Sequence, residues 1–236
     1  MGIVVAVTAE ARSLLKQSIT SGELIQRPDG VLLTVSGMGS KRATIASKAL
    51  LERGANALLS WGSAGGLTPR VSPGSLILPK TVIASNRSLY QVDAIWHDSL
   101  CNRLRGHVEF HTDSMVESPA VVRTPAEKAI LFLETGAIGV DMESAAVGAV
   151  AQEERIPFMV VRAVADGVDT TIPQSTLNAF DEFGRLNFMK LLQGVGRHPS
   201  ELFALFRIGR NYRAAQRTLA AVARLIGNSL GPRPIP

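Results

Sequence analysis

The sequence predicts an α/β fold in which a mixed, largely parallel twisted sheet is flanked by helices on both faces. Apolar runs of strand length alternate with helical patterns over residues 1–193, and glycine or polar residues follow most of these runs. Such alternation is typical of this class of fold. Because ligands of these sheets bind beyond the carboxyl ends of the strands, we expect a functional site at that edge.

The N-terminal part of the chain gives clear strand and helix patterns. Continuous apolar runs predict buried strands, and helix-forming residues follow two of them. Ser40 is expected to cap the second helix, because a serine hydroxyl can accept a hydrogen bond from a free N–H of the first turn. The predicted elements are strands at 2–8, 31–36 and 56–61 and helices at 9–17 and 40–53.

The following elements include one helix with a strong start signal. Thr124 precedes Pro125, which suits the first helical position. Glu127 lies three residues after the cap, so Thr124 and Glu127 form a capping box. This helix is expected to stop near Gly136. The predicted elements are strands at 76–84, 107–111, 137–140 and 157–164 and helices at 124–136 and 142–155.

Two glycine-containing segments follow predicted strands, at 36–40 and at 62–66. Glycines there let backbone N–H groups approach an anion or a planar ligand, and Ser63 adds a hydroxyl. The alternative is a tight turn without a ligand. Neither segment has the spacing of a dinucleotide-binding or P-loop motif, which disfavours those two nucleotide sites.

Carboxylates follow two other predicted strands. Asp141 and Glu143 flank Met142 at the start of a helix, where they either offset the helix dipole or accept hydrogen bonds from a sugar diol. Asp166 comes directly after a buried strand and before Gly167. It is either a turn-forming residue or an acid with a raised pKa that can donate a proton.

Composition excludes several classes of protein. The net charge is +5, but residues 185–236 hold nine Lys or Arg against one acid, so the basicity belongs to the tail. With only 5% aromatic residues, a nucleic-acid partner is not expected. Cys101 is the single cysteine and the four histidines lack HExxH spacing, so neither a disulfide within the chain nor a metal is expected. No membrane span or signal peptide is recognised, and a cytoplasmic location is expected.

Four separated motifs resemble the nucleoside phosphorylase and nucleosidase superfamily. They are SGMGS at 36–40, GSAGGL at 62–67, VDMESAA at 140–146 and IPFMVVRAVADGVD at 156–169. They occur in the order and with the spacing of that family, which includes purine nucleoside phosphorylase, uridine phosphorylase and methylthioadenosine nucleosidase. The resemblance covers residues 1–193 and implies a homo-oligomeric enzyme acting on a small nucleoside.

The resemblance also implies roles for individual residues. Asp166 would protonate the departing purine, and Glu143 would accept the ribose hydroxyls, with Met142 packed against the sugar. The implied base-binding residues are Ala64, Gly65, Met115 and Val116. The implied phosphate-binding residues are Arg12, Gly39, Ser40 and Ser63.

The segment 8–12 bears on whether phosphate or water attacks the sugar. Hydrolytic relatives carry a water-activating glutamate here, whereas this chain places an alanine at the position that we align with it and has Arg12 nearby to clamp phosphate. We therefore expect phosphorolysis, with inorganic phosphate as co-substrate and no other cofactor. A shift of one residue makes Glu10 the base, and the alternative is a hydrolytic methylthioadenosine/adenosylhomocysteine nucleosidase. A non-catalytic nucleoside-binding protein with the same fold is a further alternative.

Within the superfamily, AEAR at 9–12, TPAEKAILFLETGA at 124–137 and the basic tail most resemble the hopanoid-associated phosphorylases. This resemblance implies that adenosylhopane is cleaved to adenine and a ribose 1-phosphate product.

The tail, residues 194–236, is expected to be a helical extension of the domain at 1–193. Apolar residues recur at helical spacing on one side, and arginines occupy another. Such a helix suits peripheral contact with an anionic bilayer, or else packs on the domain with a solvated arginine face. The apolar set is Tyr212, Ala215, Leu219, Val222 and Ile226, and the basic set is Arg207, Arg210, Arg213, Arg217 and Arg224.

Overall fold

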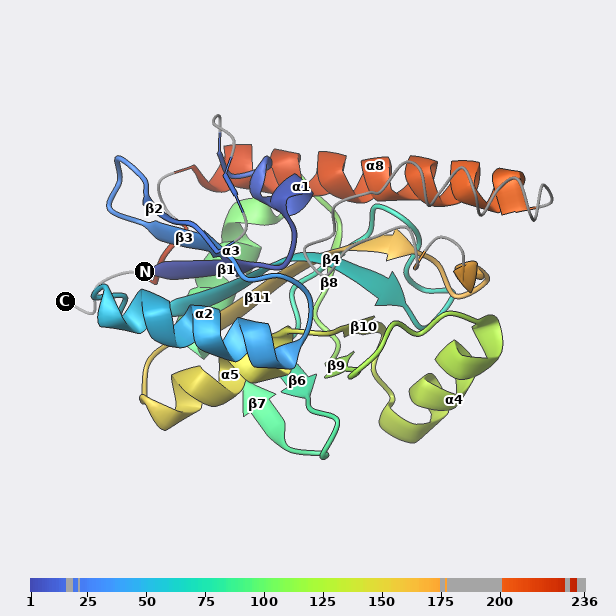
Figure 1. The fold of residues 1–236 in the computed structure, drawn as a ribbon, viewed down its shortest axis with the longest axis horizontal. Coiled ribbons are helices and arrows are strands. Elements are labelled where there is room, and N and C mark those ends of the chain that lie inside the picture. Colours follow the sequence, from blue (N-terminus) through green and yellow to red (C-terminus); the bar gives the residue numbers. More distant parts are fainter. Residues whose placement is uncertain (16–18, 21, 175–176, 178–200, 228–229, 233–236) are drawn as a thin grey trace.

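The computed structural model describes residues 1–232 except 16–18, 21, 175–176, 178–200 and 228–229. Within them, eleven strands form one mixed sheet with helices on both faces, which confirms the predicted fold class (Figure 1). The strands are β1 Gly2–Val5, β2 Leu24–Gln26, β3 Leu32–Val35, β4 Leu58–Gly66, β5 Leu76–Ile77, β6 Thr81–Ile83, β7 Leu89–Gln91, β8 Phe110–His111, β9 Met115–Glu117, β10 Gly139–Asp141 and β11 Phe158–Asp166. The helices are α1 Thr8–Ala11, α2 Ser40–Glu52, α3 Ala94–Leu104, α4 Pro125–Thr135, α5 Ser144–Glu153 and α8 Glu201–Ile226.

The centre of the sheet is parallel. β1 lies between β3 and β4, and β4 also pairs with β11, all in parallel. Their side chains are almost all buried, as expected for strands covered on both faces. The carboxyl ends of four strands therefore meet at one edge, and this edge carries most of the polar residues described below.

β4 differs from its prediction in a way that shapes this edge. The strand was expected to end at Trp61, but it continues to Gly66, so the glycine-rich segment is strand and not turn. β10 pairs with the extension in the antiparallel direction, Val140 opposite Gly65. This pairing turns β10 back along β4, so Asp141 and the residues after it return toward the middle of β11.

Helix boundaries depend on contacts that are only partly local. The capping box of Thr124 and Glu127 is confirmed, and Gly136 ends α4 in the left-handed conformation. The predicted cap of α2 is wrong: Gly39, at φ 97°, is the N-cap, and the hydroxyl of Ser40 donates to Glu117 instead. The helix expected at 9–17 is described only as the short α1.

Several strands and one helix were not predicted as such. The run at 76–84 forms two strands, β5 and β6, because residues 78–80 leave the sheet between them. The expected strand at 107–111 contracts to β8. β2, β7, β9 and α3 were missed, and three of these four are only three residues long.

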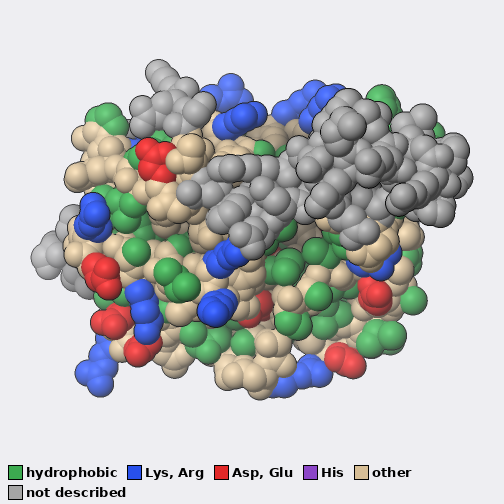
Figure 2. Space-filling model, in the orientation of Figure 1, with side chains coloured by type: hydrophobic (Ala, Val, Ile, Leu, Met, Phe, Trp, Pro, Cys, Tyr) green, Lys and Arg blue, Asp and Glu red, His purple; other side chains and the backbone are tan. Residues whose placement is uncertain are grey.

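α8 packs along one face of the sheet, and α2 and α5 cover the opposite face (Figure 1). Ala215, Leu219, Val222 and Ile226 are buried against the domain. The apolar side of the helix is therefore occupied by the protein itself. Lys and Arg side chains line the outer edge where α8 runs (Figure 2).

This packing limits how α8 could touch a bilayer. Its outward stripe combines four exposed arginines with two exposed phenylalanines, Phe203 and Phe206. Bilayer contact stays a prediction and concerns this stripe alone. No helix in the described ranges is long and apolar enough to cross a membrane. The domain boundary predicted at residue 194 lies outside the described residues. The arginines of the stripe are Arg210, Arg213, Arg217 and Arg224.

The packing of α8 predicts a stability difference between two leucines of the same helix. Leu219→Ala removes a fully buried side chain and should lower the free energy of unfolding by about 2–5 kcal/mol. Leu225→Ala, where the side chain is 43% exposed, should change it by less than about 0.5 kcal/mol. Urea unfolding of the two variants measures both values, and equal losses would contradict the docking of α8.

Candidate active site

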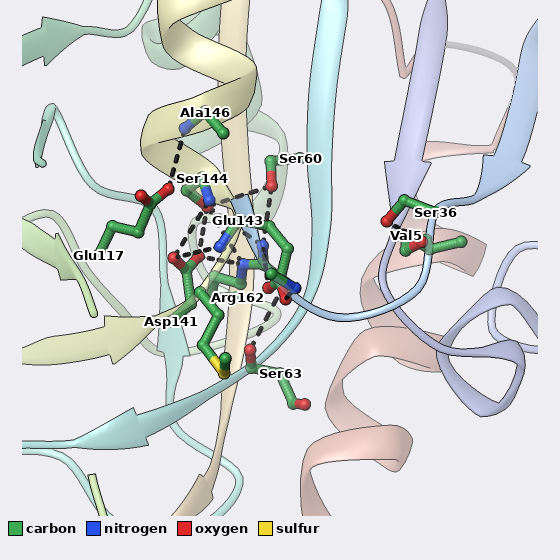
Figure 3. Close-up of polar contacts among 12 residues, drawn as sticks. Val5, Ser36, Ser60, Ser63, Glu117, Asp141, Glu143, Ser144, Ala146 and Arg162 are labelled. Atoms are coloured by element: carbon green, nitrogen blue, oxygen red, sulfur yellow. Dashed lines mark hydrogen bonds and ion pairs between the residues drawn. The ribbon is translucent and has the colours of Figure 1, made fainter. Parts of the chain in front are cut away.

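Arg162 of β11 is the centre of a buried charge cluster (Figure 3). Its Nε lies 2.7 Å from Asp141 Oδ2, and its Nη2 lies 3.6 Å from Glu143 Oε2 and donates to Ser60 Oγ at 2.8 Å. The side chain is 1% exposed. Burial alone would lower the pKa of the guanidinium, but Asp141 and Glu143 outweigh burial and raise it. Arg162 is therefore a fixed cation.

Glu143 is buried at the N-terminus of α5. Its Oε1 accepts a hydrogen bond from the backbone N–H of Gly39 at 2.9 Å. Burial raises the pKa of Glu143 to about 7, although Arg162 acts in the opposite direction and Asp141 adds to the rise. A carboxyl with this pKa holds a proton or accepts hydrogen bonds near neutral pH, which suits an acceptor for sugar hydroxyls.

Glu10 lies in α1, directly after β1, and its side chain reaches the charge cluster around Arg162. It is 3% exposed, and its Oε1 accepts from the N–H of Ser63 at 2.8 Å and from the hydroxyl of Ser63 at 2.6 Å. The other oxygen, Oε2, is buried without a hydrogen-bond partner in the described part of the chain. A buried polar atom in this state marks a place where water or a ligand is bound.

Glycine at position 62 makes this arrangement possible. A Cβ atom there would lie 2.3 Å from Nη1 of Arg162 and 2.7 Å from Oε2 of Glu10. Both charged groups therefore lie directly over the backbone of β4, where no side chain other than hydrogen fits.

Asp166 lies at the end of β11, opposite Gly65 of β4. Its carboxyl oxygens are 3.3 and 3.4 Å from the position of a Cβ on Gly65, so this glycine also gives room to a carboxyl group. Burial raises the pKa of Asp166, and the ammonium of Lys128 opposes that rise. Lys128 Nζ contacts Asp166 Oδ2 and donates to the carbonyl of Gly167 at 2.7 Å.

Ser63 and Gly65 of β4 each lie against a carboxyl group. Glu10 is bound to Ser63, and Asp166 lies against Gly65. Two carboxyl groups along the same strand can carry out acid–base chemistry on a bound group.

The donors predicted to bind phosphate are occupied by carboxylates. Gly39 donates to Glu143, Ser40 to Glu117 at 2.8 Å, and Ser63 to Glu10. Arg12, the predicted clamp, is exposed at the C-terminal end of α1. The structure therefore brings Gly39, Ser40 and Ser63 to one region but binds them to protein anions.

The residues predicted to hold the base and sugar are spread over three strands. Ala64 and Gly65 lie in β4 beside Asp166, and Met142 is half-buried next to Glu143. Met115 and Val116 are buried in β9 and not in the expected loop. Met115 packs with Ala64 and Val164, which keeps it next to the candidate acid's strand.

Sequence reasoning gave no role to Arg162 or Lys128 and treated Glu10 only as an alternative. Arg162 lies within the motif at 156–169. An arginine in the middle of a strand indicates a function only once its partners are known. Lys128 has no signal, because its helix exposes Ile130 and Leu133 and buries the lysine. Among the described residues, no group of three or more His, Cys, Asp or Glu is arranged to hold a metal ion.

Known proteins resemble this chain in sequence and in fold. The family model of the Phosphorylase superfamily matches residues 15–193. A 5′-methylthioadenosine/S-adenosylhomocysteine nucleosidase of Buchnera aphidicola is 27% identical over 172 residues. That alignment covers 65% of this chain and 66% of the relative, slightly under two thirds of its length.

Two solved structures share the fold. The first is the 5′-methylthioadenosine/S-adenosylhomocysteine nucleosidase of Neisseria meningitidis in complex with methylthio-immucillin-A, with a TM-score of 0.72, 17% identity and coverage of 97% of this chain and 98% of that one. The second is the futalosine hydrolase of Helicobacter pylori, with a TM-score of 0.66, 16% identity and coverage of 94% and 96%. At such identities the likeness is one of fold.

The raised pKa of Glu143 predicts how stability depends on pH. A carboxyl with a higher pKa in the folded state binds its proton more tightly there, so its contribution is complete below about pH 4.5 and is lost as pH rises to about 7. Glu143→Gln should flatten this decline, which amounts to at most about 1.4 kcal/mol per pH unit. Urea unfolding across that range measures the slope.

The matched control for this measurement is Glu153→Gln, since the side chain of Glu153 is 63% exposed. This variant should keep the slope of the unchanged protein. A Glu143→Gln protein with the same slope as the control would show that Glu143 does not carry the raised pKa.

Proposed function

Because the chain belongs to the phosphorylase superfamily, we propose that it is a nucleosidase that hydrolyses the N-glycosidic bond of an adenine nucleoside. The observation that carries this proposal is the buried carboxyl group of Glu10. Ser63 binds its Oε1, and its Oε2 has no hydrogen-bond partner among the residues that the structure describes. We infer that Glu10 accepts a proton from water.

The proposed reaction uses the carboxyl groups of Glu10 and Asp166 at opposite ends of the breaking bond. Glu10 takes a proton from water as the water oxygen bonds to the anomeric carbon. The bonding electrons leave with the base, and Asp166 donates its proton to the base nitrogen. Positive charge develops on the sugar in the transition state, and the anionic cluster around Glu143 stabilises it.

The charges around Glu10 favour water over phosphate as the nucleophile. A phosphate at this place would face the carboxyls of Glu10 and Glu143, and the nearby guanidinium of Arg162 is already bound to Asp141. The negative charges of these neighbouring carboxyls oppose binding of a further anion. We therefore reverse the preference for phosphorolysis that the sequence suggested.

The proposed substrate class is an adenine nucleoside with a substituent on the 5′ carbon. The Buchnera relative and the Neisseria structure are named as enzymes of methylthioadenosine and adenosylhomocysteine. Adenosylhopane, expected from the sequence resemblance, belongs to the same chemical class. Assembly as a homo-oligomer stays a prediction.

Three single variants test this proposal through release of adenine in phosphate-free buffer. Glu10→Gln and Asp166→Asn should each lower kcat by about 10²–10⁴-fold, because each removes one proton-transfer group. Arg12→Ala should keep the rate, since its side chain is exposed. A rate that falls with Arg12→Ala and survives Glu10→Gln would contradict hydrolysis and favour a phosphate clamp.

A further inference from the structure

We propose that Lys128 is a positioning residue for the general acid Asp166. Lys128 binds one carboxyl oxygen of Asp166, and the other oxygen delivers the proton. The inference rests on the proposed function, in which Asp166 protonates the departing base. Lys128 comes from α4, which none of the predicted motifs connects with the chemistry.

The contacts of Lys128 fix its protonation state. The side chain is completely buried, and Nζ meets three acceptors: Asp166 Oδ2, the carbonyl of Gly167 at 2.7 Å and the carbonyl of Thr170 at 3.2 Å. Three acceptors require three N–H donors, which only the ammonium form supplies. Lys128 is therefore a buried cation in contact with the carboxyl group of Asp166.

A lysine at this position is electrostatically costly. It lies in the first turn of α4, at the positive end of the helix dipole, and it has no exposure to water. Packing does not require it, because the apolar residues Ile130 and Leu133 of the same helix face solvent. A placement that costs stability and lies against the candidate acid is expected where function requires it.

The helix that carries Lys128 is fixed to the segment that follows Asp166. Two hydrogen bonds join Arg123 and Ile172. The backbone N–H of Ile172 donates to the carbonyl of Arg123 at 2.9 Å. The Arg123 side chain donates back to the carbonyl of Ile172 at 3.2 Å. This clamp holds Nζ of Lys128 at a set place relative to the end of β11.

The grip on Oδ2 decides which oxygen reacts. An oxygen that accepts from an ammonium is the poorer site for a proton, so the transferable proton resides on Oδ1. When Oδ1 gives its proton to the base, the carboxyl becomes a carboxylate beside a cation already in place. Lys128 stays charged throughout and stabilises the negative charge that appears on Asp166 in the transition state.

Within the described part of the chain, few other charges face Asp166. Asp169 lies in the following turn and pairs with Arg207 of α8 at 3.7 Å, and this pair is largely exposed. Arg162, earlier in β11, is bound to Asp141 and Glu143. Lys128 is the charged group that opposes the effect of burial on the pKa of Asp166. Removing its charge should therefore make Asp166 a weaker acid.

The test is the pH dependence of kcat for Lys128→Met, measured by adenine release without phosphate. We expect kcat on the plateau to fall by about 10²-fold with KM little changed, because the cation that stabilises the negative charge developing on Asp166 is lost. At the same time the loss of activity at high pH should move to higher pH, since Asp166 keeps its proton longer. Damage to the fold alone would lower kcat without this shift.

Matched variants complete the experiment. Lys48→Met removes an exposed lysine and should leave the profile unchanged. If Lys128→Met does not fold, Lys128→Gln keeps N–H donors for the two carbonyls without the charge, and the same shift is expected. In an Asp166→Asn background, Lys128→Met should cause no further loss in kcat, because Lys128 acts only through Asp166.

The outcomes separate the two proposals. No adenine release by the unchanged enzyme contradicts the proposed function itself. Release by the unchanged enzyme, together with an unshifted profile in the folded Lys128 variants or an additive loss in the Asp166→Asn background, overturns the role of Lys128.

Discussion

The site depends on the burial of one guanidinium, that of Arg162. Three carboxyl groups surround it, those of Asp141, Glu143 and Glu10. The first two form ion pairs with it at 2.7 and 3.6 Å. Without a fixed cation, carboxylates removed from water would bind protons or separate. Because Arg162 projects from the middle of β11, its partners must converge from α1, β10 and α5, and the order of the strands brings them there.

At both ends of the site, a buried cation lies against carboxyl groups. At one end Arg162 keeps an anionic cluster in place. In the proposed reaction, positive charge develops on the sugar there. At the other end Lys128 contacts the single carboxyl group that we propose gives up a proton. Gly62 and Gly65 make both ends possible, because each lets charged side chains lie directly on the backbone of β4.

What the sequence could predict was local or periodic. The capping box at Thr124 depends on residues three apart, and the apolar face of α8 depends on helical spacing, so both could be recognised. The cap at Ser40 failed because its hydroxyl binds Glu117, 77 residues away. The glycine-rich segment was expected to follow the strand and not to belong to it, because its pairing partners in β10 lie far away in the chain.

The candidate site was predictable in its acids but not in its balance of charge. Asp166 and Glu143 stand at strand ends, where sequence reasoning places functional groups. The role of Glu10 depended on a register of one residue, which only its hydrogen bonds to Ser63 distinguish. Lys128 is a buried lysine in a helix that exposes two apolar residues, Ile130 and Leu133, and no periodic pattern predicts that.

The most direct test of the account is the origin of the oxygen on the released sugar. A single turnover in ¹⁸O-labelled water without phosphate should give adenine and a free sugar that carries the label at its anomeric carbon. Cleavage that begins only when phosphate is added, with an unlabelled sugar 1-phosphate as the product, would contradict the assignment of Glu10 as the base that activates water.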